Sequence, residues 1–358
     1  VWHAWGDQMA GALSEAGQAL HDRALIRSAV AEAGAFIPHV LAQGGGEGGW
    51  TPAPSDRSQI AYGADALLQN LLRTARASGR RSFSRLAGIA AAWYFGNNPA
   101  GRRIYDRATG RTFDGIEADG KLNPNSGAES TIHGLLSMIA LDGRPRVRTM
   151  ALRARRAARE SWRLLEAESG VLSGAAELIE PQETATDEGA FSGNGYVRLA
   201  PGGALTLRVR LAHRRRFRAL PAFWRQAPLR ALGTVYRFGG KSFGDVWQGG
   251  AGPRGVTPEP GYLDDRGRGL PVDFDALLLE PEIERLLLSA GGATHGILRS
   301  AAPTRRLVRL RLGPGLYRAF AYDARGRLRE RATGSAGRLA APVVPGGFTY
   351  LLGARRAG

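Results

Sequence analysis

The spacing of apolar residues changes near residue 165, and this change constrains the fold more than any other feature of the sequence. Before it, apolar residues recur every three or four positions, as in amphipathic helices. After it, they alternate with polar residues, as in half-buried strands. A chain of 358 residues is also too long for one ordinary core. We therefore predict two domains, a helical one over residues 1–162 and an antiparallel β-sandwich of jelly-roll type over residues 163–358.

The helical part contains several periodic stretches. One is expected to start at Ser55 and Asp56 and to end near Ser78, another follows Ser126, and an Arg-rich helix is expected near residues 145–165. The first stretch has an apolar face, and the second carries a similar set of apolar residues: Ile60, Ala64, Leu67, Leu68, Leu71 and Leu72, then Ile132, Leu135, Leu136 and Ile139. Paired helices of this kind stack into bundles or toroids.

The second half contains strand-like runs separated by turn residues. They cover residues 195–199, 204–211, 216–224, 307–312, 316–322 and 347–352. Residues 225–275 are rich in Gly and Pro, and residues 276–288 fit either a short helix or a buried strand. We expect a β-sandwich with a long insertion near residues 225–290.

The net charge of +17 would usually suggest nucleic acid or another anionic partner. Nearly all of the basic residues are Arg, since only Lys121 and Lys241 are lysine, and a GC-rich genome produces such a bias without selection for binding. No nucleic-acid-binding signature accompanies the charge, so we do not expect nucleic acid as a partner, and Arg-mediated polyanion binding is a third alternative. We also expect no membrane span, and the lack of cysteine excludes disulfides.

Glu129 is the residue with the most specific sequence context. It lies in the segment Asn-Ser-Gly-Ala-Glu-Ser-Thr, after a polar loop and at the start of an apolar helix. A carboxyl in this place can serve as a general acid. The alternative is structural, because Ser126 and Glu129 have the Ser-x-x-Glu spacing of a helix capping box.

Two motifs resemble the C-terminal part of six-hairpin (α/α)₆ toroid glycosidases. They are Trp93-Tyr94-Phe95-Gly96-Asn97-Asn98-Pro99-Ala100-Gly101 and the segment around Glu129. Over residues 1–145 the chain is similar to glycoside hydrolase family nine. The resemblance implies that Glu129 is the general acid and that Asn97, Asn98 and Asp114 line the cleft. It also implies a catalytic base on a segment ahead of Val1, so we expect the chain to be part of a longer gene product.

Further residues are candidates for sugar contacts. Trp50 and Tyr105 offer flat rings for pyranose CH groups. His133 stands four residues after Glu129, on the same helix face, where it can bind substrate.

The start of the second half resembles carbohydrate-binding modules of families six and thirty-five. The resemblance rests on Leu165-Glu166-Ala167-Glu168 and Phe191-Ser192-Gly193-Asn194-Gly195-Tyr196-Val197. It implies a structural calcium site at Glu166 and Glu168, which offer hard oxygen ligands. The candidate sugar platforms of this half are Tyr196, Trp224 and Trp247.

These patterns together favour a carbohydrate-active protein that hydrolyses glycosidic bonds in a polysaccharide, with Glu129 as general acid. The alternatives are a glycan-binding or cell-surface protein without catalysis, and the helical domain of a glycosyltransferase. The binding module favours an extracellular or cell-surface location.

Overall fold

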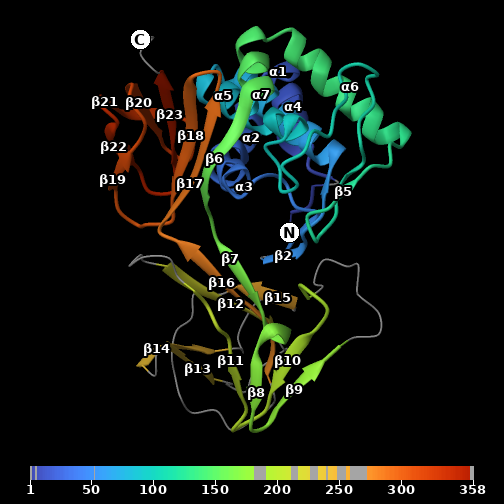
Figure 1. Ribbon diagram of the computed structural model, residues 1–358, viewed down its shortest axis with the longest axis vertical. Coiled ribbons are helices and arrows are strands. Elements are labelled where there is room, and N and C mark those ends of the chain that lie inside the picture. The colour runs from blue at the N-terminus through green and yellow to red at the C-terminus, as the bar shows by residue number, and fades with distance from the viewer. Residues whose placement is uncertain are drawn as a thin grey trace. The chain divides into compact units, whose positions relative to one another are not determined.

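The computed structural model describes residues 2–4, 6–51, 53–180, 191–210, 217–225, 233–238, 241–247, 255–258 and 272–354 (Figure 1). The chain forms two compact units. The larger unit comprises Trp2–Gly48, Arg57–Ser161 and Glu282–Gly358, and the smaller unit comprises Gly49–Asp56 and Trp162–Pro281. The chain therefore enters the smaller unit at Trp162 and returns to the larger one at Glu282.

The larger unit contains helices and strands. Its helices are α1 (Met9–Ala19), α2 (Arg23–Ala31), α3 (Ile37–Gln43), α4 (Ala61–Ser78), α5 (Arg81–Ala91), α6 (Ala128–Asp142) and α7 (Pro145–Arg153), with a π-helical turn at Glu32–Phe36 and a 3₁₀ turn at Ala92–Phe95. Its strands are β3 (Gln59–Ile60), β4 (Gly115–Ile116), β5 (Leu122–Asn123), β6 (Ala154–Glu160), β17 (Ile283–Ala290), β18 (Ala293–Ser300), β19 (Arg306–Arg311), β20 (Leu316–Tyr322), β21 (Leu328–Gly334), β22 (Arg338–Val343) and β23 (Phe348–Ala354).

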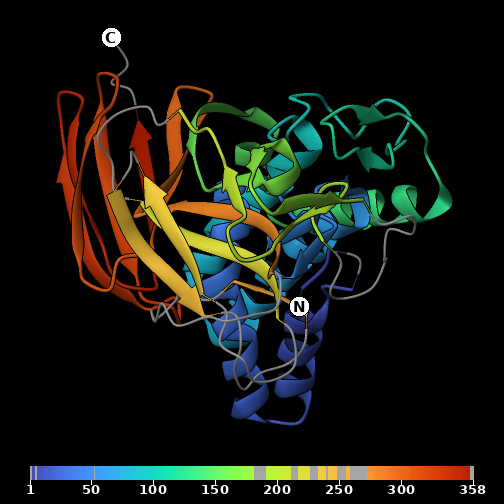
Figure 2. The same ribbon diagram turned by 90° about the horizontal axis from the view of Figure 1, so that it is seen from below.

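Helix α4 is the centre of the helical layer. It packs against α1, α2, α5 and α6, and α1 and α2 form an antiparallel pair, drawn in dark blue in Figure 2. The predicted apolar face is confirmed from Ala64 to Leu72, where the residues on that face are buried. The predicted start at Ser55 and Asp56 is wrong, because the helix begins at Ala61 and Ile60 belongs to β3. The helix ends at Gly79, whose φ of 68° lies in the left-handed region that Gly adopts without strain.

A six-stranded antiparallel sheet packs on these helices. Its strand order is β21-β20-β23-β18-β17-β6 (Figure 1). One face contributes Leu286, Ile297 and Phe348 to the core shared with the helices. The other face packs against a two-stranded ribbon of β19 and β22, where Leu310 and Leu339 are buried.

The smaller unit is built from strands. They are β1 (Gly49–Thr51), β2 (Ala53–Asp56), β7 (Arg163–Glu166), β8 (Val171–Ser173), β9 (Ala176–Ile179), β10 (Tyr196–Leu199), β11 (Ala204–Thr206), β12 (Phe217–Arg225), β13 (Gly233–Phe238), β14 (Lys241–Trp247), β15 (Gly255–Pro258) and β16 (Val272–Pro281), with a 3₁₀ turn at Ala167–Ser169. The main sheet has the order β15-β12-β16-β10-β9, and β7 also pairs with β16. Val197, Phe223 and Phe274 form the core of this unit.

The predicted fold class, a helical toroid followed by one β-sandwich, is wrong. The helices of the larger unit pack around α4 and on a sheet made by strands between Ile283 and Ala354, and short strands interrupt the helical region. The expected Arg-rich helix over residues 145–165 ends at Arg153, because the next residues form β6 and pair with β17. Hydrophobic periodicity is local and does not reveal a pairing between strands so far apart in sequence.

One stretch of the larger unit, Arg23–Gln43, is long and apolar enough to cross a membrane. Half of its most apolar window is buried in the protein, and every residue of α3 is buried. Packing in the core of the larger unit therefore accounts for its apolar composition.

Candidate functional site

Glu129 is exposed in the first turn of α6 and takes no part in capping that helix. The N-cap residue is Gly127, whose N–H donates to Asp114 Oδ1 at 2.8 Å. Ser126 Oγ instead donates to the carbonyl of Thr112 at 2.7 Å. The alternative reading of Ser126 and Glu129 as a capping box therefore does not hold. The Glu129 carboxylate has no hydrogen bond or ion pair among the residues that the structure describes.

His133, one turn further along α6, is held by a buried carboxylate on α4. The Nδ1–H of His133 donates to Asp65 Oδ2 at 2.8 Å. Asp65 is only 4% exposed, and its other oxygen accepts from Ser137 Oγ at 2.7 Å and Gln69 Nε2 at 3.1 Å. This network selects the Nδ1–H tautomer, so Nε2 of His133 is available as a hydrogen-bond acceptor.

Tyr62 completes the group. Its ring centroid lies 5.6 Å from that of His133. Burial raises the pKa of the Tyr62 phenol, and the negative charge of Glu129 raises it further, which places the Glu129 carboxylate near the phenol. We call Tyr62, Asp65, Glu129 and His133 the α4–α6 site. It offers a carboxyl, an imidazole and a phenol, groups that can bind sugar hydroxyls and transfer protons.

Asp65 and Tyr62 were missed in the sequence. Both lie in an apolar helical stretch, and the spacing of its apolar residues does not show which face of the helix contacts α6. A signal was present, however, because a single Asp between Ala64 and Ala66 on a buried helix face needs a partner. Helix α6 offers suitable donors in His133 and Ser137, and both bond to Asp65.

The other predicted residues of this half have varied settings. Asp114 holds the start of α6, as described above. Asn98 is buried, and its amide donates to the carbonyls of Trp93 and Arg102 at 2.7 Å each, so it stabilises its own turn. Asn97 is also buried and lines a small cavity. Tyr105 is half-buried and lines an open depression with Arg103, Asp106, Arg107, Ala108 and Phe113.

Among the predicted sugar platforms, Tyr196 is the one whose side chain the structure describes. Its ring is stacked on Phe191 with centroids 4.2 Å apart, so one of its faces is covered. Its hydroxyl accepts from Arg198 at 3.2 Å. The side chains of Trp50, Trp224 and Trp247 lie outside the described part of the chain, although their backbones belong to β1, β12 and β14.

The predicted calcium ligands of the smaller unit surround the turn at residues 192–194. Glu166 Oε2 accepts from Ser192 Oγ at 2.6 Å, and Glu168 Oε1 accepts from the N–H of Asn194 at 3.0 Å. The structure adds Asp275 of β16, whose Oδ1 accepts from the N–H of Ser192 at 3.0 Å. The sequence pattern missed Asp275, since it is far from the other two along the chain.

The carboxyl of Asp275 is strongly perturbed by its surroundings. Burial raises the pKa of Asp275 to about 8, and the charges of Glu166 and Glu168 add to the effect, although hydrogen bonds from Ser192 oppose it. Oε2 of Glu168 is buried and makes no hydrogen bond. Hard oxygen ligands of this kind suit Ca²⁺.

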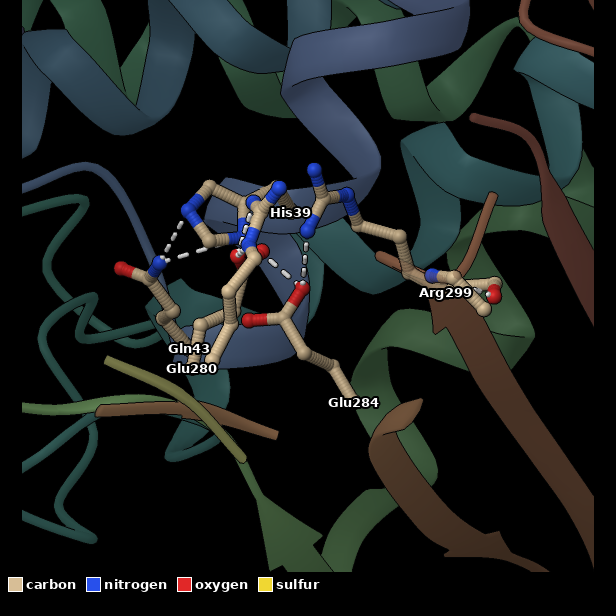
Figure 3. Close-up of polar contacts among 8 residues, drawn as sticks. His39, Gln43, Glu280, Glu284 and Arg299 are labelled. Carbon is tan, nitrogen blue, oxygen red and sulfur yellow. Dashed lines mark hydrogen bonds and ion pairs between the residues drawn. The ribbon is translucent and has the colours of Figure 1, made fainter. Parts of the chain in front are cut away.

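The larger unit also buries a network around His39 (Figure 3). Oε2 of the fully buried Glu284 accepts from Nδ1 of His39 at 2.7 Å and from Arg299 at 3.0 Å. Gln43 Nε2 donates to His39 Nε2 at 2.7 Å. Imidazole and carboxylate are ligand types for divalent metals, and this unit provides one of each here. Glu280, also drawn, belongs to the smaller unit, where it pairs with Arg218.

No protein-family model matches the chain, and no curated protein matches it. Any statement about function therefore rests on the geometry of these sites and on the resemblance of the motifs.

Proposed function

We propose that the chain is a carbohydrate-active protein that hydrolyses glycosidic bonds in a polysaccharide, with Glu129 as general acid. The observation that carries the proposal is the exposed carboxyl of Glu129 at the start of α6, which takes no part in capping, lies one helical turn before His133, and is near enough to Tyr62 to raise the pKa of its phenol. A general acid needs this access, because it must reach the oxygen of the scissile bond.

In this proposal the groups of the α4–α6 site have separate roles. Glu129 donates its proton to the leaving oxygen as the bond to the anomeric carbon breaks, while water attacks that carbon and gives its proton to a second carboxylate, which lies outside the α4–α6 site. His133 binds a sugar hydroxyl through Nε2, because Asp65 occupies Nδ1. Asp65 is buried and accepts three hydrogen bonds, so it positions His133 and does not activate water.

The smaller unit supports a second candidate function, glycan binding without hydrolysis. Its carboxylates Glu166, Glu168 and Asp275 all bond to the turn at residues 192–194, which supports the structural Ca²⁺ ion that the resemblance to binding modules implies. We infer that such an ion would rigidify the turn at residues 192–194, next to Tyr196. For either function we propose an extracellular or cell-surface location, as the resemblance to binding modules implies.

A release assay separates the two functions. The gene product that contains the chain is incubated with a panel of polysaccharides, and reducing ends are counted for the wild type, for Glu129→Gln and for the control Glu117→Gln, which changes another exposed carboxyl of the same unit. The proposal expects the Glu129 variant to lose about 100-fold in rate and the control to match the wild type. Binding in a pulldown with no release by the wild type would leave glycan binding as the function. Equal rates for all three proteins would exclude Glu129 as the acid.

A further inference from the structure

The exposed face of the β19–β22 ribbon carries arginines at adjacent positions. In the antiparallel register Arg311 is paired directly with Arg338, and Arg309 is paired with Ala340. The intervening residues Leu310 and Leu339 are buried in the core, so the three arginines lie on the opposite, solvent-facing side, and all three are exposed.

No carboxylate among the described residues forms an ion pair with these three guanidinium groups. Within the described part of the chain, none of them has a hydrogen bond either. The carboxylates nearest in sequence are engaged elsewhere, Glu330 with Arg305 at 2.6 Å and Asp323 with Arg329 at 2.9 Å. Like charges directly opposite each other destabilise an antiparallel pair. An anion bound on this face would remove that repulsion.

The geometry of the face favours a particular kind of anion. Residues two apart on a strand are separated by about 6.6 Å, and paired residues across strands by about 5 Å. Guanidinium groups at these intervals match carboxylates or sulfates repeated along an extended polymer. The remaining exposed residues of the face are Leu307 and Ala340, so no aromatic ring is present on it to stack nucleobases.

We propose that the exposed face of the β19–β22 ribbon binds an acidic polysaccharide through Arg309, Arg311 and Arg338. The requirement for anionic groups follows from the ribbon alone, whereas the choice of a polysaccharide rests on the proposed function. The ribbon shares no residue with the α4–α6 site, so it acts as a docking surface that holds the polymer and does not take part in bond cleavage.

Titration calorimetry with polygalacturonate tests this inference. The matched ligands are its fully methyl-esterified form, which has the same backbone without the charge, and a single-stranded DNA oligonucleotide. The proteins are the wild type, Arg311→Ala/Arg338→Ala, and the control Arg23→Ala/Arg27→Ala, which removes two exposed charges from α2 of the same unit. Each titration is repeated at several salt concentrations.

We expect the wild type to bind polygalacturonate and not its methyl ester. The ribbon variant should lose about tenfold in affinity and show a salt dependence smaller by about one to two in logarithmic slope, whereas the control should change less than twofold. The same loss in both variants would show that net charge alone drives binding. Tighter binding of the oligonucleotide would assign the face to nucleic acid. Either result would overturn the proposal.

Two further readouts keep the test decisive. The ribbon variant should melt at the same or a higher temperature than the wild type, because a repulsive pair has been removed; if it does not fold, Arg311→Gln/Arg338→Gln replaces it. Catalysis is not needed for any of these measurements. Polygalacturonate binding without sugar release by the wild type from any polysaccharide would count against the proposed hydrolysis alone, and sugar release without polygalacturonate binding would count against the ribbon alone.

Discussion

Oδ2 of Asp65 accepts a hydrogen bond of 2.8 Å from Nδ1 of His133 and so fixes the orientation of an imidazole that is otherwise accessible. Asp65 accepts from three donors, on Gln69, His133 and Ser137. In Asp65→Asn, at least one of these donors would face the N–H₂ group of the amide, which cannot accept its hydrogen bond. We expect the free energy of unfolding to fall by about 2 kcal/mol and His133 to lose its single tautomer. Urea denaturation measures the first effect, and long-range ¹H–¹⁵N spectra of the imidazole measure the second. The control Asp142→Asn, at an exposed pair with Arg148, should leave both unchanged.

Glu32 predicts how stability depends on pH. Burial raises the pKa of Glu32 from 4.5 to about 8, and the negative charge of nearby Asp7, whose own pKa is raised by burial, contributes. Between pH 4.5 and about pH 8, Glu32 therefore keeps its proton in the folded state and loses this proton in the unfolded state. The contribution of Glu32 to stability is fully present below pH 4.5 and should be lost as pH rises toward 8, by at most about 1.4 kcal/mol per pH unit.

The variant Glu32→Gln tests this assignment. It should flatten the fall in urea midpoint between pH 5 and pH 8, since the amide does not titrate. The control Glu15→Gln changes an exposed glutamate on α1 and should keep the slope of the wild type. An unchanged slope in Glu32→Gln would mean that another group causes the pH dependence.

Asp275 predicts how calcium binding depends on pH. Because its pKa is raised to about 8, Ca²⁺ must displace a proton from the cluster at neutral pH. Calcium affinity, measured by calorimetry, should therefore increase between pH 6 and pH 8 and then level off. Glu168→Gln should weaken calcium binding at least tenfold, because substitutions at metal sites commonly cost this much in affinity. Glu177→Gln, which changes an exposed carboxyl on β9, should leave calcium affinity unchanged. Binding that is independent of pH would argue against Asp275 as a ligand.

Glu284 predicts the cost of breaking the buried network around His39. Its side chain is fully buried and accepts from His39 and Arg299. Glu284→Ala leaves cationic and polar groups without this partner, so we expect a loss of about 3 to 5 kcal/mol in the free energy of unfolding. Glu330→Ala removes the partner of Arg305 in a more exposed pair and should cost less than about 1 kcal/mol. Similar losses for both would show that the network is not specially stabilising.

The local structure was more predictable than the topology. The apolar face of α4 follows from the spacing between Ala64 and Leu72, because a helix closes its hydrogen bonds within its own segment. The pairing of β6 with β17 joins Ala154 to Ala290, and no local pattern encodes which distant strand a given strand will join. The predicted toroid failed for this reason.

The candidate site shows the same limit. The context of Glu129 at the start of a helix is visible in the sequence, and α6 begins at Ala128. Its environment depends on which face of α4 meets α6, and that is set by packing in three dimensions. Ile132 and Ile139, apolar residues of α6, are 56% and 68% exposed, so apolar spacing alone did not identify the covered face.

The most direct test of the proposed function is a double-mutant cycle in sugar release between Glu129→Gln and His133→Asn. If the two side chains act in one site, the double variant should be about as slow as the slower single variant, since effects of residues that act as a unit are not additive. Losses that multiply in the double variant would mean that the two residues act independently. A wild-type gene product that contains the chain and releases no sugar from any polysaccharide would contradict the account outright.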